Sequence, residues 1–246
     1  MTSTITPAAP MRPAPESWGR RLAGYVGELM ITFGLIMMLL VVYQLWWTNI
    51  QADRKANQID NALKQAWSSG AAIPNGAIGI MYIERLGKSF EKPIVQGVTL
   101  DDLAEGVGHF TNTADPGGLG NFAVAGHRAT HGQPFAYLNE MQPGDKVWVE
   151  TKTAWYQYTI DAMPGTAGKA YKLVSPNDGA VLDPVPENAA STQNGYKLTK
   201  KELTLVTCNP RWGSSTRLIV YGQLTETDPN SPGAPMPAGM SYFQGS

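Results

Sequence analysis

The sequence predicts a mainly β domain, a sandwich or a barrel, preceded by one membrane-spanning helix. Three observations support this prediction. A long uncharged apolar run lies near the N-terminus, several short apolar runs follow from about residue 73, and 26 Gly and 18 Pro supply many turns. The 43% hydrophobic content is sufficient for a packed core.

The first element is the apolar run over 29–47, which carries no charged residue. Its length suits a helix that crosses a hydrocarbon core of about 30 Å. Tyr43, Trp46 and Trp47 are typical of a membrane interface at its far end. A cleaved signal peptide has a shorter apolar region and ends in small residues. The apolar character runs all round the helix, which favours a span over a buried core helix. We therefore predict a transmembrane helix over 22–48.

The residues that flank the span predict its orientation. Residues 1–21 are rich in Pro, Ala, Ser and Thr and are expected to form a disordered cytoplasmic N-terminus. Arg12, Arg20 and Arg21 precede the span closely, whereas the positive charges that follow it lie farther away. Because positive residues favour the cytoplasmic side, the bulk of the chain is predicted to lie outside.

A polar helical stalk is expected over 49–72, with Ile50, Ile59, Leu63 and Trp67 as a sparse apolar face. It would carry the β-rich domain, predicted over 73–225, and a disordered tail would follow over 226–246, which is again rich in Pro, Ser and Gly.

The strands of the β-rich domain are predicted from runs of β-branched and aromatic residues bounded by turn residues. The runs are AIGIMYI, EKPIVQGV, NFAVAGH, DKVWVET, WYQYTIDAM, ELTLVTC and RLIVYGQL. Two short helices are expected at 101–110, capped by Leu100 or Asp101, and at 134–141.

The composition excludes several function classes. The formal net charge is −1 and there is no dense basic run, so nucleic acid is not an expected partner. The single cysteine excludes an intramolecular disulfide and a cysteine-based zinc site. The sequence contains no cluster of Asp and Glu that would favour calcium binding. We expect neither a metal nor a cofactor.

The candidate catalytic groups stand at strand ends. Cys208 ends the run ELTLVTC, Arg217 begins RLIVYGQL, and His127 ends NFAVAGH. A cysteine nucleophile needs a nearby imidazole or cation, and acyl transfer needs a donor to the oxyanion. If these strands are neighbours, the three groups meet at one rim. Each residue also has a simpler interpretation, as a buried thiol, a surface histidine or a solvated arginine, and the residues alone leave the two interpretations evenly balanced.

These segments also resemble a known family. The segment TLVTC over 204–208 resembles the TLxTC signature of sortases, the cysteine transpeptidases of Gram-positive cell surfaces. The segments NFAVAGHR and RLIVYG resemble the histidine and arginine strands of that family, in the same order. The segments GVGHFTNTADPGGLGN, THGQPFAYLNEMQPGDKVWVET and TCNPR resemble class E sortases of high-GC Gram-positive bacteria. The resemblance covers about 73–224.

The resemblance implies a closed β-barrel of about eight strands with short helices. It also implies that Cys208 is the nucleophile, His127 the acid and base, and Arg217 the stabiliser of the bound peptide and its oxyanion. The strand residues expected to bind substrate are Thr204, Leu205 and Thr207. His109 matches a recurrent position that is not catalytic, and no role is implied for His131.

The activity implied is cleavage of an LPxTG- or LAxTG-type sorting signal between Thr and Gly through a cysteine thioester. The acyl group would pass to an amine of a lipid II-like cell-wall precursor or to a pilin lysine. The implied partners are surface proteins that bear the signal, with a housekeeping role favoured over pilin polymerisation. The implied location is the cell membrane, as a single-pass type II protein with the catalytic domain on the extracellular face.

The sequence departs from the family pattern in two places that bear on specificity. The segment HFTNTADPG replaces the more usual HYPGTALPG, and a long loop over 169–199 precedes the cysteine strand. Because no carboxylate is recognised that would orient His127, we hypothesise that only a minor thiolate–imidazolium population is active, which predicts a bell-shaped rate profile.

Other classes fit less well. L,D-transpeptidases place the histidine a few residues before the cysteine, and papain-like enzymes place the cysteine before the histidine. A non-catalytic β-barrel module that binds a surface partner remains the alternative, and it predicts that Cys208→Ala leaves function intact. Arg211, three residues after the cysteine, is expected to close the turn rather than to contact a peptide.

Overall fold

The computed structural model describes residues 18–73 and 76–243, and these fall into two units, 1–45 and 46–246. Helix α1 (Trp18–Ser69) begins inside the segment predicted to be disordered, of which 1–17 lie outside the described residues. In the first unit the helix is apolar and exposed over 29–43, and it is a candidate membrane span by length and composition.

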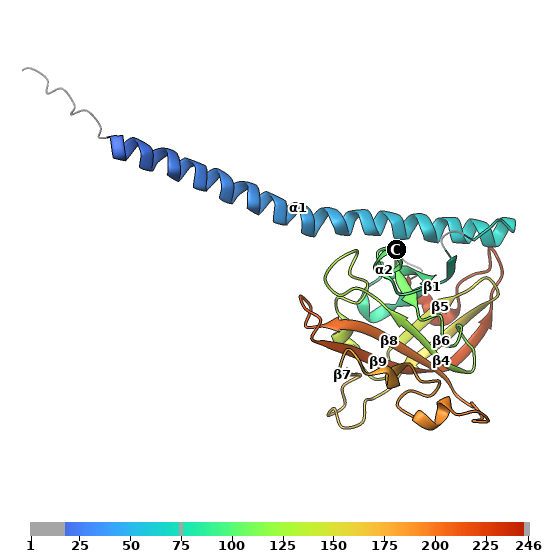
Figure 1. Ribbon diagram of the computed structural model, residues 1–246. Coiled ribbons are helices and arrows are strands. Elements are labelled where there is room, and N and C mark those ends of the chain that lie inside the picture. Colours follow the sequence, from blue (N-terminus) through green and yellow to red (C-terminus); the bar gives the residue numbers. More distant parts are fainter. Residues whose placement is uncertain (1–17, 74–75, 244–246) are drawn as a thin grey trace, which may run out of the picture. The chain divides into compact units, whose positions relative to one another are not determined.

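The second unit is built on one twisted sheet that closes into a barrel (Figure 1). The strands in the described residues are β1 (Ala77–Ile83), β2 (Glu91–Gln96), β3 (Val107–His109), β4 (Gly120–Ala125), β5 (Lys146–Glu150), β6 (Ala154–Ile160), β7 (Tyr171–Val174), β8 (Lys201–Asn209) and β9 (Thr216–Pro229). Eight strands run in the order β6-β5-β1-β2-β3-β4-β8-β9, and pairing of β6 with β9 closes the ring. Strand β7 pairs with the first part of β9, over 217–220, and β6 with the later part, over 222–229. The predicted eight-stranded barrel is therefore confirmed.

All seven predicted runs form strands, and two further strands were not predicted. Strand β3 has three residues, too few to show alternation, and lies within the segment 101–110 that was predicted to be helical. Strand β7 lies within the segment predicted to be a long loop. That segment also holds two short 3₁₀ helices, η4 (Gly179–Leu182) and η5 (Ala189–Thr192). It is therefore more regular than its Pro- and Gly-rich composition suggested.

The two predicted helices are shorter than expected. Helix α2 (Leu100–Leu103) is capped by Thr99, whose hydroxyl accepts the backbone N–H of Asp102 while the Asp102 carboxylate accepts that of Thr99. This reciprocal box, rather than Leu100 or Asp101, starts the helix. The second helix is a single 3₁₀ turn, η3 (Leu138–Glu140), and a further turn, η2 (Glu84–Leu86), follows β1.

The core of the barrel is filled by side chains that alternate inward along the strands. Phe122 of β4, Tyr158 of β6 and Leu205 of β8 are each at most 1% exposed within it. Tyr158 also closes one end, because its hydroxyl accepts the backbone N–H of Gly117. The barrel is therefore a solid support for the loops at its rim rather than a ligand cavity.

A second apolar cluster lies outside the barrel, where the predicted stalk packs on the sheet. Ile59, Leu63 and Trp67 of α1 pack against a set of barrel side chains that includes Tyr82 and Trp148. Of the four predicted apolar-face residues, these three are at most 7% exposed. The apolar face thus binds the helix to the domain instead of leaving it as a free spacer.

The C-terminal segment differs from the prediction of a disordered tail over 226–246. Strand β9 continues to Pro229, and a 3₁₀ segment, η6 (Ala238–Phe243), follows. Met240 is fully buried and Phe243 is 8% exposed in the same cluster that holds the α1 helix. Burial of these apolar side chains outweighs the low intrinsic order of a Pro- and Gly-rich segment. Residues 244–246 lie outside the described residues.

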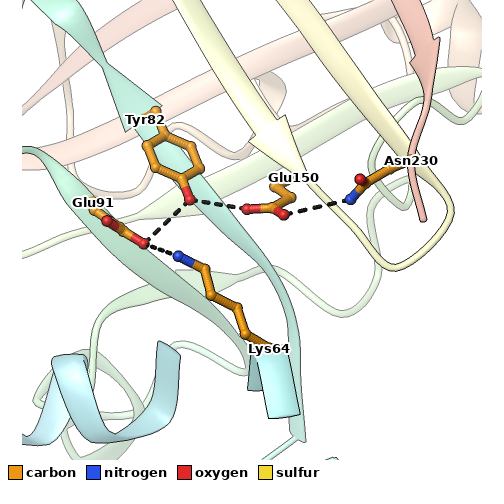
Figure 2. A network of polar contacts seen from close by, with 5 residues as sticks. All are labelled: Lys64, Tyr82, Glu91, Glu150 and Asn230. Carbon is orange, nitrogen blue, oxygen red and sulfur yellow. Dashed lines mark hydrogen bonds and ion pairs between the residues drawn. The ribbon is translucent and has the colours of Figure 1, made fainter. Parts of the chain in front are cut away.

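A polar network joins the docked helix to the barrel (Figure 2). Tyr82 Oη lies 2.9 Å from Glu150 Oε2 and 3.2 Å from Glu91 Oε1, and Lys64 Nζ donates to Glu91 Oε1 at 2.5 Å. Asp60, one helical turn before Lys64, is 4% exposed, and neither of its carboxylate oxygens has a hydrogen-bond partner. The interface between the helix and the barrel therefore contains a buried carboxyl group, that of Asp60, which makes no hydrogen bond.

Candidate active site

Cys208 stands near the end of β8 as a half-buried free thiol. Two threonines of the same strand fasten it to β4. Thr204 Oγ1 donates to Asn121 Oδ1 at 2.7 Å, and Thr207 Oγ1 donates to the carbonyl of Gly126 at 2.8 Å. Strands β4 and β8 are also paired in parallel, so both backbone and side-chain hydrogen bonds fix the strand that carries the thiol to β4.

The residues predicted to bind substrate, Thr204, Leu205 and Thr207, have buried side chains. They are 0%, 0% and 2% exposed, and both hydroxyls are engaged inside the protein. Substrate binding by these residues therefore stays a prediction. These residues fix the strand that presents Cys208.

His127 follows β4, next to the strand of Cys208. The parallel register pairs Ala125 with Val206, and the Gly126 N–H donates to the carbonyl of Val206 at 3.1 Å. Continuing this register places His127 level with Cys208 on the neighbouring strand. Gly126 permits the approach, since a Cβ there would lie 2.7 Å from the Phe135 ring.

Arg217 lies on the other side of Cys208. Strands β8 and β9 are antiparallel, and the two residues are directly opposite each other. The half-buried guanidinium donates from Nη1 to the carbonyls of Ser214 and Thr216 at 3.0 and 3.2 Å. Those bonds fold the side chain onto the turn between the two strands. The structure therefore brings His127, Cys208 and Arg217 to three adjacent strand ends, β4, β8 and β9.

The environment of His127 favours its neutral form. Burial is the main cause that lowers the pKa of its imidazole, and the nearby His131 is the second. The two rings stack with their centres 4.9 Å apart and their planes 29° from parallel. His127 Nε2 is buried without a hydrogen-bond partner. A neutral imidazole with a free nitrogen can accept a proton, which is what a base toward a thiol must do.

Arg128 is a functional candidate that sequence reasoning missed. The side chain is only 9% exposed, and Nη1 donates to Asn209 Oδ1 at 2.5 Å and toward the carbonyl of Cys208 at 3.4 Å. Its Nη2 donates to Asn139 Oδ1 at 2.8 Å. Arg128 thus ties the residue after His127 to the residue after Cys208. Its only sequence signal is its position directly after His127.

Arg211 does more than close the turn after the cysteine. Its Nη2 donates to Gln133 Oε1 at 2.6 Å, so the turn is joined to the loop that follows His127. The guanidinium carbon lies 5.0 Å from the centre of the Tyr137 ring and 6.0 Å from that of Trp212. This arrangement holds the side chain in place through two cation–π contacts.

The other two histidines have different surroundings. His109 is 1% exposed, with Nδ1 2.9 Å from Gln96 Oε1 and Nε2 3.0 Å from the carbonyl of Ala114, and it fastens the loop after β3. His131 is exposed and touches the site only through its stack on His127. Within the described residues, no group of three or more His, Cys, Asp or Glu side chains could hold a metal ion.

Comparisons with known proteins identify the family. A family model described as "Sortase domain" matches residues 81–225. Sortase SrtE1 of Streptomyces coelicolor is 36% identical over 85% of the chain, and Sortase SrtE2 of the same organism is 30% identical over 88% of the chain and 87% of its own length.

The chain belongs to the sortase family. Members of this family are cysteine transpeptidases, and the similarity to SrtE1 and SrtE2 confirms the predicted likeness to class E sortases. The crystal structure of sortase E1 from Streptomyces coelicolor with a tripeptide in its active site superposes with a TM-score of 0.54. It is 34% identical and covers 68% of this chain and 98% of that one. The sortase described here spans 59% of the length of SrtE1.

Proposed function

We propose that this sortase is a membrane-anchored cysteine transpeptidase that cleaves an LAxTG- or LPxTG-type sorting signal between Thr and Gly and passes the acyl group to an amine. The observation that carries the proposal is the placement of Cys208 between His127 and Arg217 at adjacent strand ends. Family membership supports it. The presence of a tripeptide in the active site of sortase E1 supports a peptide substrate.

The chemistry assigns one role to each group. The Cys208 thiolate attacks the carbonyl carbon of the threonine, and the C–S bond forms as the carbonyl oxygen becomes an oxyanion. Arg217, once turned from its own loop toward the peptide, stabilises that charge. His127 gives its proton to the glycine nitrogen, the C–N bond breaks, and a thioester remains. An incoming amine then forms a new C–N bond and expels the thiolate.

The pH dependence follows from the burial of His127. The attack needs a thiolate, and the departure of the amine needs an imidazolium. A lowered imidazole pKa makes the imidazolium scarce at neutral pH, so only a minor thiolate–imidazolium population is active. We expect a bell-shaped profile of kcat/KM against pH. Complete and rapid alkylation of Cys208 at pH 6 would contradict this mechanism.

The proposed partners are surface proteins with a C-terminal sorting signal and an amine on a lipid II-like wall precursor, with a pilin lysine as the alternative acceptor. The role we favour is housekeeping attachment of several surface proteins. The apolar segment of α1 supports anchoring in the cell membrane. The arginines before it favour a single-pass type II protein with its catalytic domain on the extracellular face.

The test is direct detection of the covalent intermediate. The detergent-solubilised full chain is mixed with an LAxTG or LPxTG peptide and an amine, and mass spectrometry follows the acyl adduct on Cys208 and the transfer product. Wild-type protein should give both, and Cys208→Ala should give neither while it unfolds at a similar temperature. A non-catalytic binding module instead predicts that the Cys208→Ala chain keeps its function. Absence of adduct and cleavage with both peptides would overturn the proposal.

Arg217 has its own test. Arg217→Lys keeps the positive charge but loses the planar fork of donors. We expect kcat to fall at least about tenfold, which corresponds to about 1.4 kcal/mol, while the unfolding temperature changes little. Near-normal turnover would show that charge alone is needed at this position.

A further inference from the structure

A polar cavity of about 300 Å³ opens next to the turn that follows Cys208. Arg211 of that turn lines one part of it, and Gln133 and Tyr137 from the loop after His127 line another. Asp53 of helix α1, Lys92 of β2 and Ser89 complete the polar lining. The cavity is therefore built from the two catalytic loops, the docked helix and the segment 86–92.

Among the charged side chains that line the cavity, one positive group has no counter-charge. Lys92 Nζ and Asp53 Oδ1 are 2.8 Å apart, so they neutralise each other. In the described part of the chain, the ion pairs do not include Arg211. Arg211 donates only from Nη2 to the neutral amide of Gln133, and its buried Nε has no partner. Arg211 as a whole is half-buried, and a guanidinium with a single neutral partner can still bind an anion.

The cavity wall is also held in a strained conformation. Gln133 has a φ of 46° and the nearby His131 a φ of 53°, which is the left-handed region that side chains other than glycine seldom adopt. Such strain is retained where the surrounding structure requires it, and it collects at functional sites. Here it places the amide of Gln133 against the guanidinium of Arg211.

The cavity is close to the reacting thioester. Arg211 follows Cys208 by three residues, so their Cα atoms are at most about 11 Å apart. On the other side, the Phe135 N–H donates to the carbonyl of His127 at 3.0 Å and closes the loop that carries Gln133. A small molecule bound at Arg211 could therefore present a second group to Cys208.

We propose that this cavity binds the carboxylate of the amine acceptor, so that the acceptor is recognised by a carboxylate one or a few residues from its reactive amine. This inference rests on the proposed transpeptidase function and deepens it. The planar guanidinium of Arg211 carries one positive charge that is not neutralised. It therefore suits a carboxylate, which carries one negative charge, better than a phosphate dianion. The bound amine attacks the thioester carbon, the C–N bond forms, the C–S bond breaks, and the amine proton passes through His127 to the Cys208 thiolate.

The test compares acceptors with and without the carboxylate. Glycine, diglycine and triglycine are each paired with their C-terminal amides, and transfer product is measured with the full chain and an LAxTG or LPxTG peptide. The measured quantity is the carboxylate-to-amide ratio of product for each length. Arg211→Gln should lower this ratio about tenfold for at least one length, as expected for loss of a charge-assisted hydrogen bond. Because the same acceptors are compared across variants, differences in amine basicity cancel.

Two variants serve as references. Lys152→Gln removes one positive charge from the exposed turn between β5 and β6, and it should leave the ratio unchanged. Arg211→Lys should lower the ratio less than Arg211→Gln, because it keeps the charge but not the fork. If Arg211→Gln fails to fold, the wild-type chain still gives an answer. N-acetylglycine, which has a carboxylate but no reactive amine, should suppress transfer to the carboxylate acceptor, and N-acetylglycinamide should not.

The outcomes separate this inference from the proposed function. An unchanged ratio in Arg211→Gln, or equal effects of the two acetylated probes, overturns the carboxylate site while cleavage of the peptide continues. Absence of any cleavage by the wild-type chain overturns the transpeptidase function and this inference together. A lowered ratio with normal behaviour of Lys152→Gln supports the carboxylate site.

Discussion

Replacing Asp60 by asparagine should stabilise the sortase at high pH and change little at low pH. Asp60 is 4% exposed beneath helix α1, and its carboxylate has no hydrogen-bond partner. Burial is the main cause that raises the pKa of this carboxyl to about 7, and the nearby Glu91 adds to it, opposed by Lys64 and Lys92. Glu150 raises it slightly further. Asparagine keeps the shape and removes the charge.

The size of the effect follows from proton linkage. The folded pKa of about 7 exceeds the ordinary value of 3.8, so the folded state keeps a proton that the unfolded chain has released between these pH values. The free energy of unfolding therefore falls as pH rises from about 4 to 7 and levels off above 7. The two pKa values differ by about 3, so burial of the Asp60 carboxyl lowers the free energy of unfolding by about 4 kcal/mol above pH 7. At pH 4 the same contribution is less than about 1 kcal/mol. If helix α1 can leave the barrel at a smaller free-energy cost than burial of the charged carboxylate, the loss of stability cannot exceed the cost of that undocking.

The assay is urea unfolding of the detergent-solubilised chain at pH 4 and pH 8, together with hydrogen exchange of residues 56–69. At pH 8 Asp60→Asn should raise the free energy of unfolding by about 2–4 kcal/mol and slow exchange in this segment. Asp53→Asn is the matched control, since it removes a half-exposed carboxylate from the same helix and should cost at most about 1 kcal/mol. A difference between Asp60→Asn and wild type that is the same at both pH values would refute the reasoning, as would destabilisation at pH 8.

Four further substitutions test other parts of the structure. Arg128→Met should lower kcat/KM at least about tenfold, because the loops after His127 and Cys208 lose their shared donor, and near-normal kinetics would show that Arg128 is only structural. His131→Ala should raise the pKa of His127, measured by NMR titration, and an unchanged value would remove His131 as a cause of its depression. Thr204→Val should cost about 1–3 kcal/mol of stability with KM unchanged, whereas a raised KM at full stability would support the predicted substrate-binding role. Met240→Ala should cost about 2–5 kcal/mol in urea unfolding, and no loss would mean that the C-terminal segment is dispensable.

The main elements of the fold could be predicted because their signals are local. The uncharged run before residue 48 and the seven β-rich runs follow from residue type and period alone. Strand β3 could not be found this way, since three residues cannot show alternation, and β7 exists only because β9 offers it an open edge. The C-terminal segment around Met240 was predicted to be disordered because it is rich in Pro, Ser and Gly, and only the common burial of its apolar side chains orders it.

The candidate catalytic residues could be proposed from chemistry and order, since the chain has one cysteine and three histidines. Arg128 and Arg211 could not be assigned in this way. Their contacts join loops that are distant in sequence, Arg128 to Asn209 and Arg211 to Gln133. Nothing in the local pattern of either segment specifies those partners.

By itself, the sequence determined the residue types at the strand ends, the β-rich class and the apolar segment before residue 48, because these depend on neighbours along the chain. Tertiary structure alone decided that Cys208 and Arg217 face each other, that Arg211 lines a cavity and that Asp60 is buried without a partner. The physical reason is that burial, register and charge pairing depend on segments that meet only when the barrel closes and the helix docks.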